Sequence, residues 1–474
     1  MKYLAFLLVV LVLAPAAIAQ AGLPVIRANS EMVTIDDGGV VKKDAWRLAP
    51  EVKPDIYEAE LVDGKPHRVV FRTDVEEIGF LVEEGRSHDF IIRWQGKDCH
   101  TRIVGIRVVP AARFDERYQE ERREKILVDI PEVYELVNIA IAMTPEARVD
   151  SNLVKRDTAY FRAVEAWFGR FRGHKLIKAL DAELRRDPGR YPRLKMDGNA
   201  FVFDGGGRIV QSPVFDRVSW GKKNELRPLL ADLQSFADQT QFREFFRSQR
   251  GTYDAQIRFF QEEADLGGMK LWLDRNFPGT SRYDSYNIIF SPLVGGSQSS
   301  NWFESNGFRE LQPHVNYPYP QDFRDRKLSP QALAVVRGTI VFTEINHGYI
   351  NPEGDRHAAR IVKATSARGA WVDISVLPEK YRPGCYPGID MFNEYMNWGL
   401  VSLRATDHVP PAEQQAVLAG VDRMMLRRGF IRFPAFSNFL VTLYRARAPG
   451  KTVADLYPEI IAWFETNNLA PPAR

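Results

Sequence analysis

The stretch that decides the fold is Val341-Phe342-Thr343-Glu344-Ile345-Asn346-His347-Gly348-Tyr349-Ile350-Asn351-Pro352. Upstream of it stands Ser329-Pro330, a serine cap followed by proline, which predicts a helix from there to about His347. Glu344 and His347 are three positions apart, so both side chains share one face at the end of that helix. A carboxylate and an imidazole in this arrangement are typical of helical metal sites.

The same stretch departs from the usual zinc peptidase helix at one position. That helix presents His-Glu-x-x-His, in which two histidines bind zinc and the glutamate activates a water. Thr343 stands here in place of the first histidine, which removes a strong nitrogen ligand. In glutamate-type zinc peptidases the third ligand is a glutamate on a following helix, and Glu394, inside a helix predicted over 388–403, fits that position. A carboxylate buried among apolar neighbours is costly unless it is paired or metal-bound.

The chain resembles an uncharacterised family of exported bacterial proteins, domain-of-unknown-function family 4932. The resemblance rests on Asp89-Phe90-Ile91-Ile92 followed by Gly96-Lys97-Asp98, on residues 130–142 and 342–352, and on Asn393-Glu394-Tyr395. It implies a zincin-like, or gluzincin-like, domain, a bound Zn²⁺ ion and a peptide or protein substrate. Some members keep both histidines, and this sequence departs from them at Thr343.

Three arrangements of the site are open. In the first, Glu344, His347 and Glu394 are all metal ligands, and so oxygen-rich a set favours manganese or iron over zinc. In the second, Glu344 is a general base, and His347 and Glu394 hold zinc with a replacement ligand. In the third, no metal binds and the domain is an inactive descendant. The candidate replacement ligands are His357, Asp355, His314 and His408.

Tyr349 and Tyr395 are the candidates to donate a hydrogen bond to a reaction oxyanion. The simpler interpretation of every one of these residues is structural. Tyrosines in an aromatic-rich chain mostly pack, and a helix-end histidine usually caps the helix or fills a hydrogen bond. Two functions from different classes follow: an exported metal-dependent hydrolase, most plausibly a zincin-like peptidase, or a non-catalytic extracytoplasmic binding protein that keeps the scaffold.

The hydrophobic pattern divides the chain in two. Short runs rich in β-branched and aromatic residues predict a small antiparallel β domain over 23–112, with strands at 68–72, 79–82, 89–94 and 99–109. A charged linker or connecting helix is predicted over 113–128. A larger, mainly helical zincin-like domain is predicted over 129–470, which makes the protein α+β.

Within the larger domain the periodicity changes to that of helices. The first begins at Pro131, and further helices are predicted at 157–171, 176–184, 224–236, 242–247, 252–273, 411–427 and 453–464. A strand is predicted at 286–290, followed by a glycine- and serine-rich loop at 295–300 whose glycines permit close backbone approach. Residues 313–320 are predicted to form an irregular loop. The aromatic residues Trp302, Phe303, Tyr317 and Tyr319 are candidates for a sugar or peptide groove.

The beginning of the chain predicts export. Residues 1–19 carry a lysine, a short apolar run and small residues ending at Ala19, which is the order of a cleaved secretory signal. No later segment is apolar enough to span a bilayer. Lys+Arg total 64 against 61 Asp+Glu, so no strong field draws nucleic acid, and basic runs such as Arg427-Arg428 are interpreted as solvated helix faces. Cys99 and Cys385 allow one disulfide or two free thiols.

Overall fold

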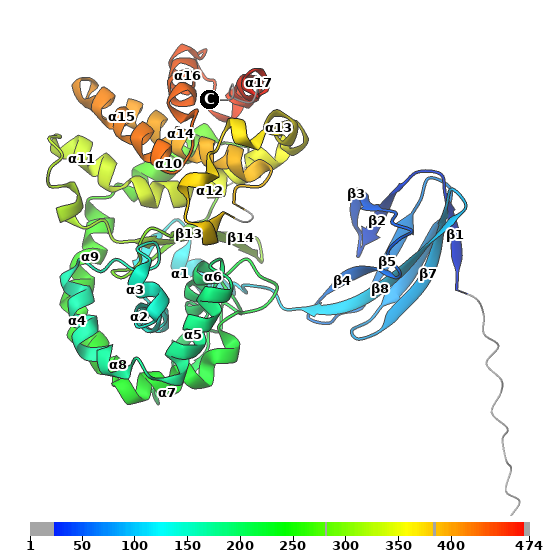
Figure 1. The fold of residues 1–474 in the computed structure, drawn as a ribbon, viewed down its shortest axis with the longest axis horizontal. Coiled ribbons are helices and arrows are strands. Elements are labelled where there is room, and N and C mark those ends of the chain that lie inside the picture. Colours follow the sequence, from blue (N-terminus) through cyan, green and yellow to red (C-terminus); the bar gives the residue numbers. More distant parts are fainter. Residues whose placement is uncertain (1–22, 280–281, 383–384, 469–474) are drawn as a thin grey trace, which may run out of the picture. The chain divides into compact units, whose positions relative to one another are not determined.

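The computed structural model describes residues 23–279, 282–382 and 385–468, and the predicted signal segment lies outside them. The chain divides into two compact units, Met1–Pro110 and Ala111–Arg474 (Figure 1). The first is rich in strands and the second combines helices with a sheet, so the predicted α+β class is confirmed at this level. Both cysteines are free thiols.

The first unit consists of two four-stranded sheets that share one hydrophobic core, ordered β1-β7-β8-β4 and β3-β2-β5-β6. The second sheet is antiparallel throughout. In the first sheet β1 runs parallel to β7 and β4 parallel to β8, so the prediction of a purely antiparallel domain is wrong for that sheet. The strands are β1 Val25–Ala28, β2 Met32–Asp37, β3 Val40–Arg47, β4 Asp55–Val62, β5 His67–Arg72, β6 Glu77–Val82, β7 Ser87–Trp94 and β8 Lys97–Val108.

The second unit is organised around a sheet in the order β13-β14-β12-β9. Its inner strands, β12 (Ser285–Ser291) and β14 (Phe308–Asn316), are almost entirely buried because helices pack against them. β9 (Ile126–Asp129) pairs parallel to β12, and β13 (Ser299–Ser305) is an antiparallel edge strand. A separate hairpin joins β10 (Phe201–Phe203) and β11 (Ile209–Gln211).

Helices make up most of the second unit. They are α1 Glu116–Arg122, α2 Glu132–Ala142, α3 Pro145–Val149, α4 Ala159–Phe168, α5 Lys175–Arg186, α6 Arg190–Gly198, α7 Leu230–Thr240, α8 Phe242–Ser248, α9 Arg250–Glu262, α10 Leu266–Asn276, α11 Pro330–Arg337, α12 Thr339–Arg356, α13 Ala358–Ala364, α14 Ile389–His408, α15 Pro411–Arg427, α16 Phe433–Ala446 and α17 Tyr457–Asn467. No helix in the described ranges combines the length and apolarity that crossing a bilayer requires.

Several predicted boundaries differ from the structure. The helix expected over 252–273 is two helices, because Asp265 adopts a left-handed conformation with φ 53° and caps α10. The helix expected to end at His347 is also two, with the break at Gly338, and α12 continues to Arg356. The first four residues of the expected loop at 313–320 belong to strand β14, which ends at Asn316. In this strand Pro313 is paired in register with Ser300 of β13. The expected linker contains α1 and β9, which belong to the second unit.

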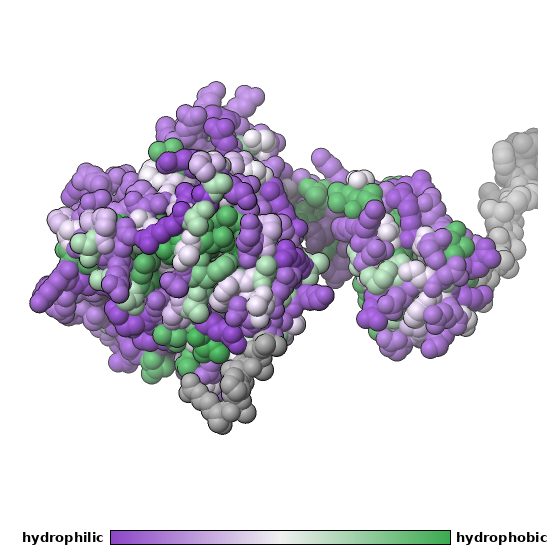
Figure 2. All heavy atoms as spheres, turned by 90° about the horizontal axis from the view of Figure 1, so that it is seen from above, coloured by the Kyte–Doolittle hydropathy of each residue, from purple (hydrophilic) through white to green (hydrophobic). Residues whose placement is uncertain are grey.

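Helix α12 lies between the sheet and α14, and two glycines allow this close packing. A Cβ at Gly348 would come within 2.8 Å of the Leu311 side chain on β14. A Cβ at Gly354 would come within 2.7 Å of the Asn393 side chain on α14. The face of the molecule in Figure 2 is mostly hydrophilic, with apolar patches between polar side chains.

Candidate functional site

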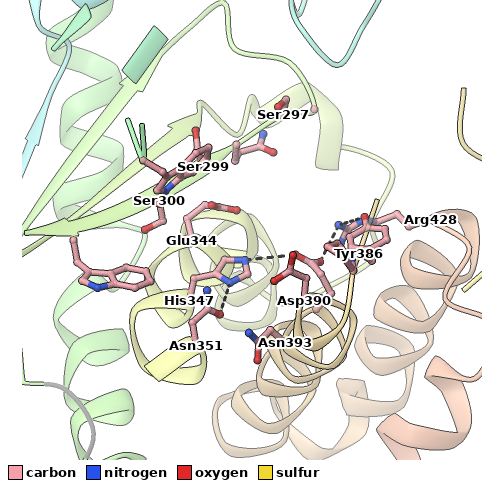
Figure 3. A pocket seen from close by; sticks show the side chains of 16 residues that line it. Ser297, Ser299, Ser300, Glu344, His347, Asn351, Tyr386, Asp390, Asn393 and Arg428 are labelled. Atoms are coloured by element: carbon pink, nitrogen blue, oxygen red, sulfur yellow. Dashed lines mark hydrogen bonds and ion pairs between the residues drawn. The ribbon is translucent and has the colours of Figure 1, made fainter. Parts of the chain in front are cut away.

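A cavity of about 740 Å³ opens between the edge strand and two helices of the second unit. The loop 296–298 and β13 line one side, and α12 and α14 line the other. Tyr386 and Arg428 close one end (Figure 3). This cavity therefore lies beside the stretch from which the sequence analysis started.

Three predicted site residues reach this cavity. Glu344 and His347 project from the middle of α12, and Glu394 projects from α14. His347 Nε2 lies 3.6 Å from Glu394 Oε1. The 3.6-residue period of α12 and its packing against α14 thus bring together side chains that are fifty positions apart.

Both ring nitrogens of His347 already have protein partners. Nδ1 lies 3.2 Å from Asn351 Oδ1, and Nε2 lies 2.8 Å from Asn397 Nδ2. An amide oxygen only accepts and an amide nitrogen only donates, so Nδ1 carries the proton and Nε2 accepts from Asn397. Both ring nitrogens of His347 are therefore already hydrogen-bonded within the protein.

Glu394 forms an ion pair with a residue that the sequence analysis placed on a solvated face. Arg428 donates to Glu394 Oε2 at 2.9 Å and to the Tyr386 hydroxyl at 3.2 Å. Its guanidinium also lies 5.3 Å from the ring centre of Trp398. The prediction for Arg428 is wrong because α15 ends at Arg427, and the next residue turns into the cavity. Glu394 and Tyr386 in turn raise the pKa of Arg428 against the effect of burial.

Besides His347 and Glu394, Glu344 has Lys195 of α6 as an ionisable neighbour. Burial raises the pKa of Glu344, and the nearby Glu394 raises it further, while His347 and Lys195 act in the opposite direction. Lys195 is completely buried, and its ammonium donates to the Ser297 carbonyl at 2.7 Å. Burial lowers the pKa of Lys195 to about 7, although Glu344 opposes this shift. Glu344 and Lys195 are thus a carboxyl and an amine that both have reduced tendencies to be charged.

Thr343 does not substitute for the missing ligand. Its side chain is buried, and its hydroxyl donates to the Ile340 carbonyl of its own helix at 2.7 Å. Across the described ranges, no group of three or more His, Cys, Asp or Glu side chains is arranged to hold a metal ion. The side chains of these four types that line the cavity are His347 and the carboxyl groups of Glu344, Asp390 and Glu394.

Trp302, one of the aromatic residues predicted for a groove, also lines this cavity, whereas the remaining predicted metal ligands and oxyanion donors do not. The Tyr349 hydroxyl donates to Asp274 at 2.7 Å, and the Tyr395 hydroxyl donates to the Trp371 carbonyl at 2.8 Å. The other candidates that lie elsewhere are Asp355, His314, His357 and His408. Each tyrosine therefore has the packing and hydrogen-bonding role that the simpler interpretation gave it.

The glycine- and serine-rich loop has a structural explanation. A Cβ at Gly295 would lie 2.1 Å from the Ser151 carbonyl, and one at Gly296 would lie 2.7 Å from the Asn152 side chain. These glycines therefore allow the loop to approach 151–152 rather than a phosphate. The approach fixes the backbone that leads into β13.

Other residues of the cavity were not identified from the sequence. Asp390 and Asn393 line it from α14, and Trp220 lines it from a loop. The Trp220 indole donates to the Ser300 carbonyl at 2.9 Å, so one backbone group of the edge strand is already paired. The period of α14 could have indicated Asp390, which is one turn before Glu394. Nothing local marks Trp220, because only the tertiary fold places it here.

Comparisons with protein families, with curated proteins and with solved structures return no match for this chain. The resemblance to family 4932 therefore stays an expectation from the sequence. The functional argument rests on the geometry of the cavity.

Proposed function

We propose that the cavity binds an extended, basic peptide, and that the protein is an exported binding protein on a zincin-like scaffold without a resident metal. The arrangement of elements supports the scaffold. A helix with Glu-x-x-His lies against an antiparallel edge strand, and a second helix supplies a glutamate. An edge strand has an unpaired side, along which an extended chain can add by β-augmentation.

One observation carries the proposal: the side chains that would bind zinc are satisfied by the protein itself. Glu394 is paired with Arg428, and both nitrogens of His347 are hydrogen-bonded. A catalytic zinc site needs three protein ligands, and Thr343 leaves the described arrangement one short. The guanidinium of Arg428 also supplies the positive charge that a metal ion would bring to Glu394. The residues present therefore do not fit a resident zinc ion.

The charge of the cavity indicates the ligand. Glu344, Asp390 and Glu394 line it against the single Arg428, and a bound cation would favour the charged forms of Glu344 and Asp390, whose pKa values burial raises. Buried polar atoms without a described partner, Ser299 Oγ and Ser300 Oγ, lie on β13. A ligand with ammonium or amide donors would satisfy these groups. An extended peptide with lysine or arginine side chains meets both requirements.

The test is a binding measurement with matched peptides. Fluorescence anisotropy would compare a labelled lysine-rich decapeptide with its glutamate-rich counterpart. We expect only the lysine-rich peptide to bind, and Asp390→Asn to weaken its binding about tenfold, as loss of one charge-assisted contact implies. Glu120→Gln, at an exposed position of α1, is the control and should change nothing. Equal binding of both peptides would contradict the proposal.

Metal-dependent hydrolysis of a peptide is the second candidate function. It is favoured by the placement of Glu344, His347 and Glu394 on one cavity. In that case His347 and Glu394 would hold Zn²⁺ or another divalent ion, which would polarise a bound carbonyl as a Lewis acid. Glu344, whose pKa is raised, would accept a proton from water as general base.

Metal analysis separates the two candidates. Mass spectrometry of the purified protein should find less than stoichiometric zinc, manganese or iron. One equivalent of metal that disappears in Glu394→Ala would favour the hydrolase, and peptide cleavage lost in Glu344→Gln would establish it. If the purified wild-type protein contains no metal and its circular dichroism spectrum is that of a folded chain, the binding protein is supported.

A further inference from the structure

A second cavity lies among α11, α12, α14 and α15, and other residues than those of the first cavity line it. Its volume is about 240 Å³. Much of its wall is aliphatic or aromatic: Val336, Ile340, Trp398, Val417, Val421 and Met424. The space is comparable to about eight water-sized groups. An apolar hollow of this kind takes an apolar chain more readily than water.

A basic hollow of about 510 Å³ adjoins this cavity. The two share Arg326, Val417 and Gly420. Lys327, Arg423 and Arg427 also line the basic hollow, together with the single carboxylate of Asp325. The apolar cavity and the basic hollow therefore lie side by side along α15.

Two guanidinium groups face the same point on α15. A Cβ at Gly420 would lie 4.0 Å from one nitrogen of Arg326 and 3.9 Å from one nitrogen of Arg423. Because Gly420 has no side chain, no Cβ stands beside these two guanidinium groups where the two hollows adjoin. A ligand that passes over Gly420 would contact both arginines.

The four cations are not neutralised within the described part of the chain. No ion pair there joins Arg326, Lys327, Arg423 or Arg427 to a carboxylate, whereas nearby Arg337 pairs with Glu263 at 2.8 Å. Burial lowers the pKa of Arg326, and the charges of Arg423 and Arg427 lower it further. Like charges held this close are unfavourable, and an anion between them would remove the repulsion.

We propose that the two hollows together bind one anionic amphiphile, with its alkyl chain in the apolar cavity and its headgroup on the guanidinium groups. A carboxylate and a phosphate monoester share the chemistry required, because guanidinium donors pair with both in bidentate geometry. The volume of the apolar cavity, about 240 Å³, favours a single chain of about eight to ten carbons. This site is independent of the proposed peptide site.

The test is calorimetric titration of the full protein with sodium decanoate, decyl phosphate, 1-decanol and sodium acetate. We expect decanoate or decyl phosphate to bind, and acetate and decanol to bind at least tenfold more weakly. The double variant Arg423→Ala/Arg427→Ala should weaken binding of the anionic chain about tenfold or more, since two charge-assisted contacts are lost. These side chains are exposed, so the fold should be unaffected.

The matched control is Arg247→Ala/Arg258→Ala, which removes two exposed arginines from α8 and α9 and should leave affinity unchanged. Decanol binding as tightly as decanoate would overturn the role of the cations. Acetate binding as tightly would overturn the role of the apolar cavity. Binding to anionic vesicles that depends on Arg423 and Arg427, without binding of monomeric decanoate, would assign the patch to a membrane surface instead and would also overturn the proposal.

Discussion

Replacing Lys195 with methionine tests the electrostatics of the peptide site. Lys195 is fully buried beside Glu344 and donates to the Ser297 carbonyl. Methionine keeps the length and removes the amine. The substitution leaves the Ser297 carbonyl without its donor, which costs about 1–3 kcal/mol at any pH. It also removes the cost of charging an amine in a buried position.

The cost of charging the buried Lys195 amine depends on pH. Burial lowers the pKa of Lys195 from 10.5 to about 7, so between these pH values the unfolded chain binds more protons than the folded one. The stability contributed by a neutral Lys195 is therefore present at high pH and is lost as the pH falls from about 10.5 to 7. The total change is roughly 4–5 kcal/mol, with a slope of up to about 1.4 kcal/mol per pH unit.

The measurement is urea unfolding of wild type and Lys195→Met at pH 6 to 10. We expect wild type to be more stable at pH 10 by up to about 2 kcal/mol, and the variant to be more stable at pH 6 by about 1–4 kcal/mol. Lys178→Met, at an exposed position of α5, should differ from wild type by an amount that does not change with pH. A difference for Lys195→Met that is flat from pH 7 to 10 would refute the reasoning.

Four further predictions concern other parts of the molecule. Glu394→Gln should lower the unfolding free energy by about 1–3 kcal/mol because it leaves Arg428 without its carboxylate partner. Adding Arg428→Gln should recover part of this loss. Additive losses in the double-mutant cycle would exclude coupling between Glu394 and Arg428. Thr343→His places a second histidine one helical turn before His347 and so completes a two-histidine motif. In the double variant with Arg428→Gln, mass spectrometry should find about one zinc ion per chain. A metal-free double variant would count against the zincin-like scaffold. Trp302→Ala should weaken peptide binding several-fold in anisotropy because its ring lines the cavity, with a modest loss of thermal stability because the half-buried ring also packs against the core; unchanged affinity would remove it from the site. Residues 23–110 alone should unfold cooperatively in circular dichroism because they have their own core, and a non-cooperative transition would show that this core is insufficient.

The sequence predicted local elements well where hydrophobic period and end signals agree. The strand at 286–290 and the helix at 411–427 are present, since one is an apolar and aromatic run interrupted only at Asn287 and the other begins at a proline. Prediction was less accurate where a single backbone angle decides the outcome. The break at Asp265 depends on a left-handed conformation that aspartate adopts only in some contexts, so the pattern over 252–273 was predicted as one helix.

The candidate site divides in the same way. The spacing of Glu344 and His347 was enough to place both on one face of a helix, because that relation depends only on helical geometry. Arg428, Lys195 and Trp220 could not be assigned to the site, since each comes from a different element. Only packing brings Arg428 and Trp220 to the cavity wall and Lys195 close to Glu344.

By itself the sequence determined which side chains can be neighbours along one helix or strand. It therefore determined that Glu344 and His347 lie on the same face of one helix. Only the tertiary structure decided what those side chains contact: an arginine on Glu394, two asparagines on His347 and a buried lysine near Glu344. The physical reason is that the local period of the chain fixes direction within an element, whereas the charge and hydrogen-bonding environment of a side chain is set by distant segments that pack around it.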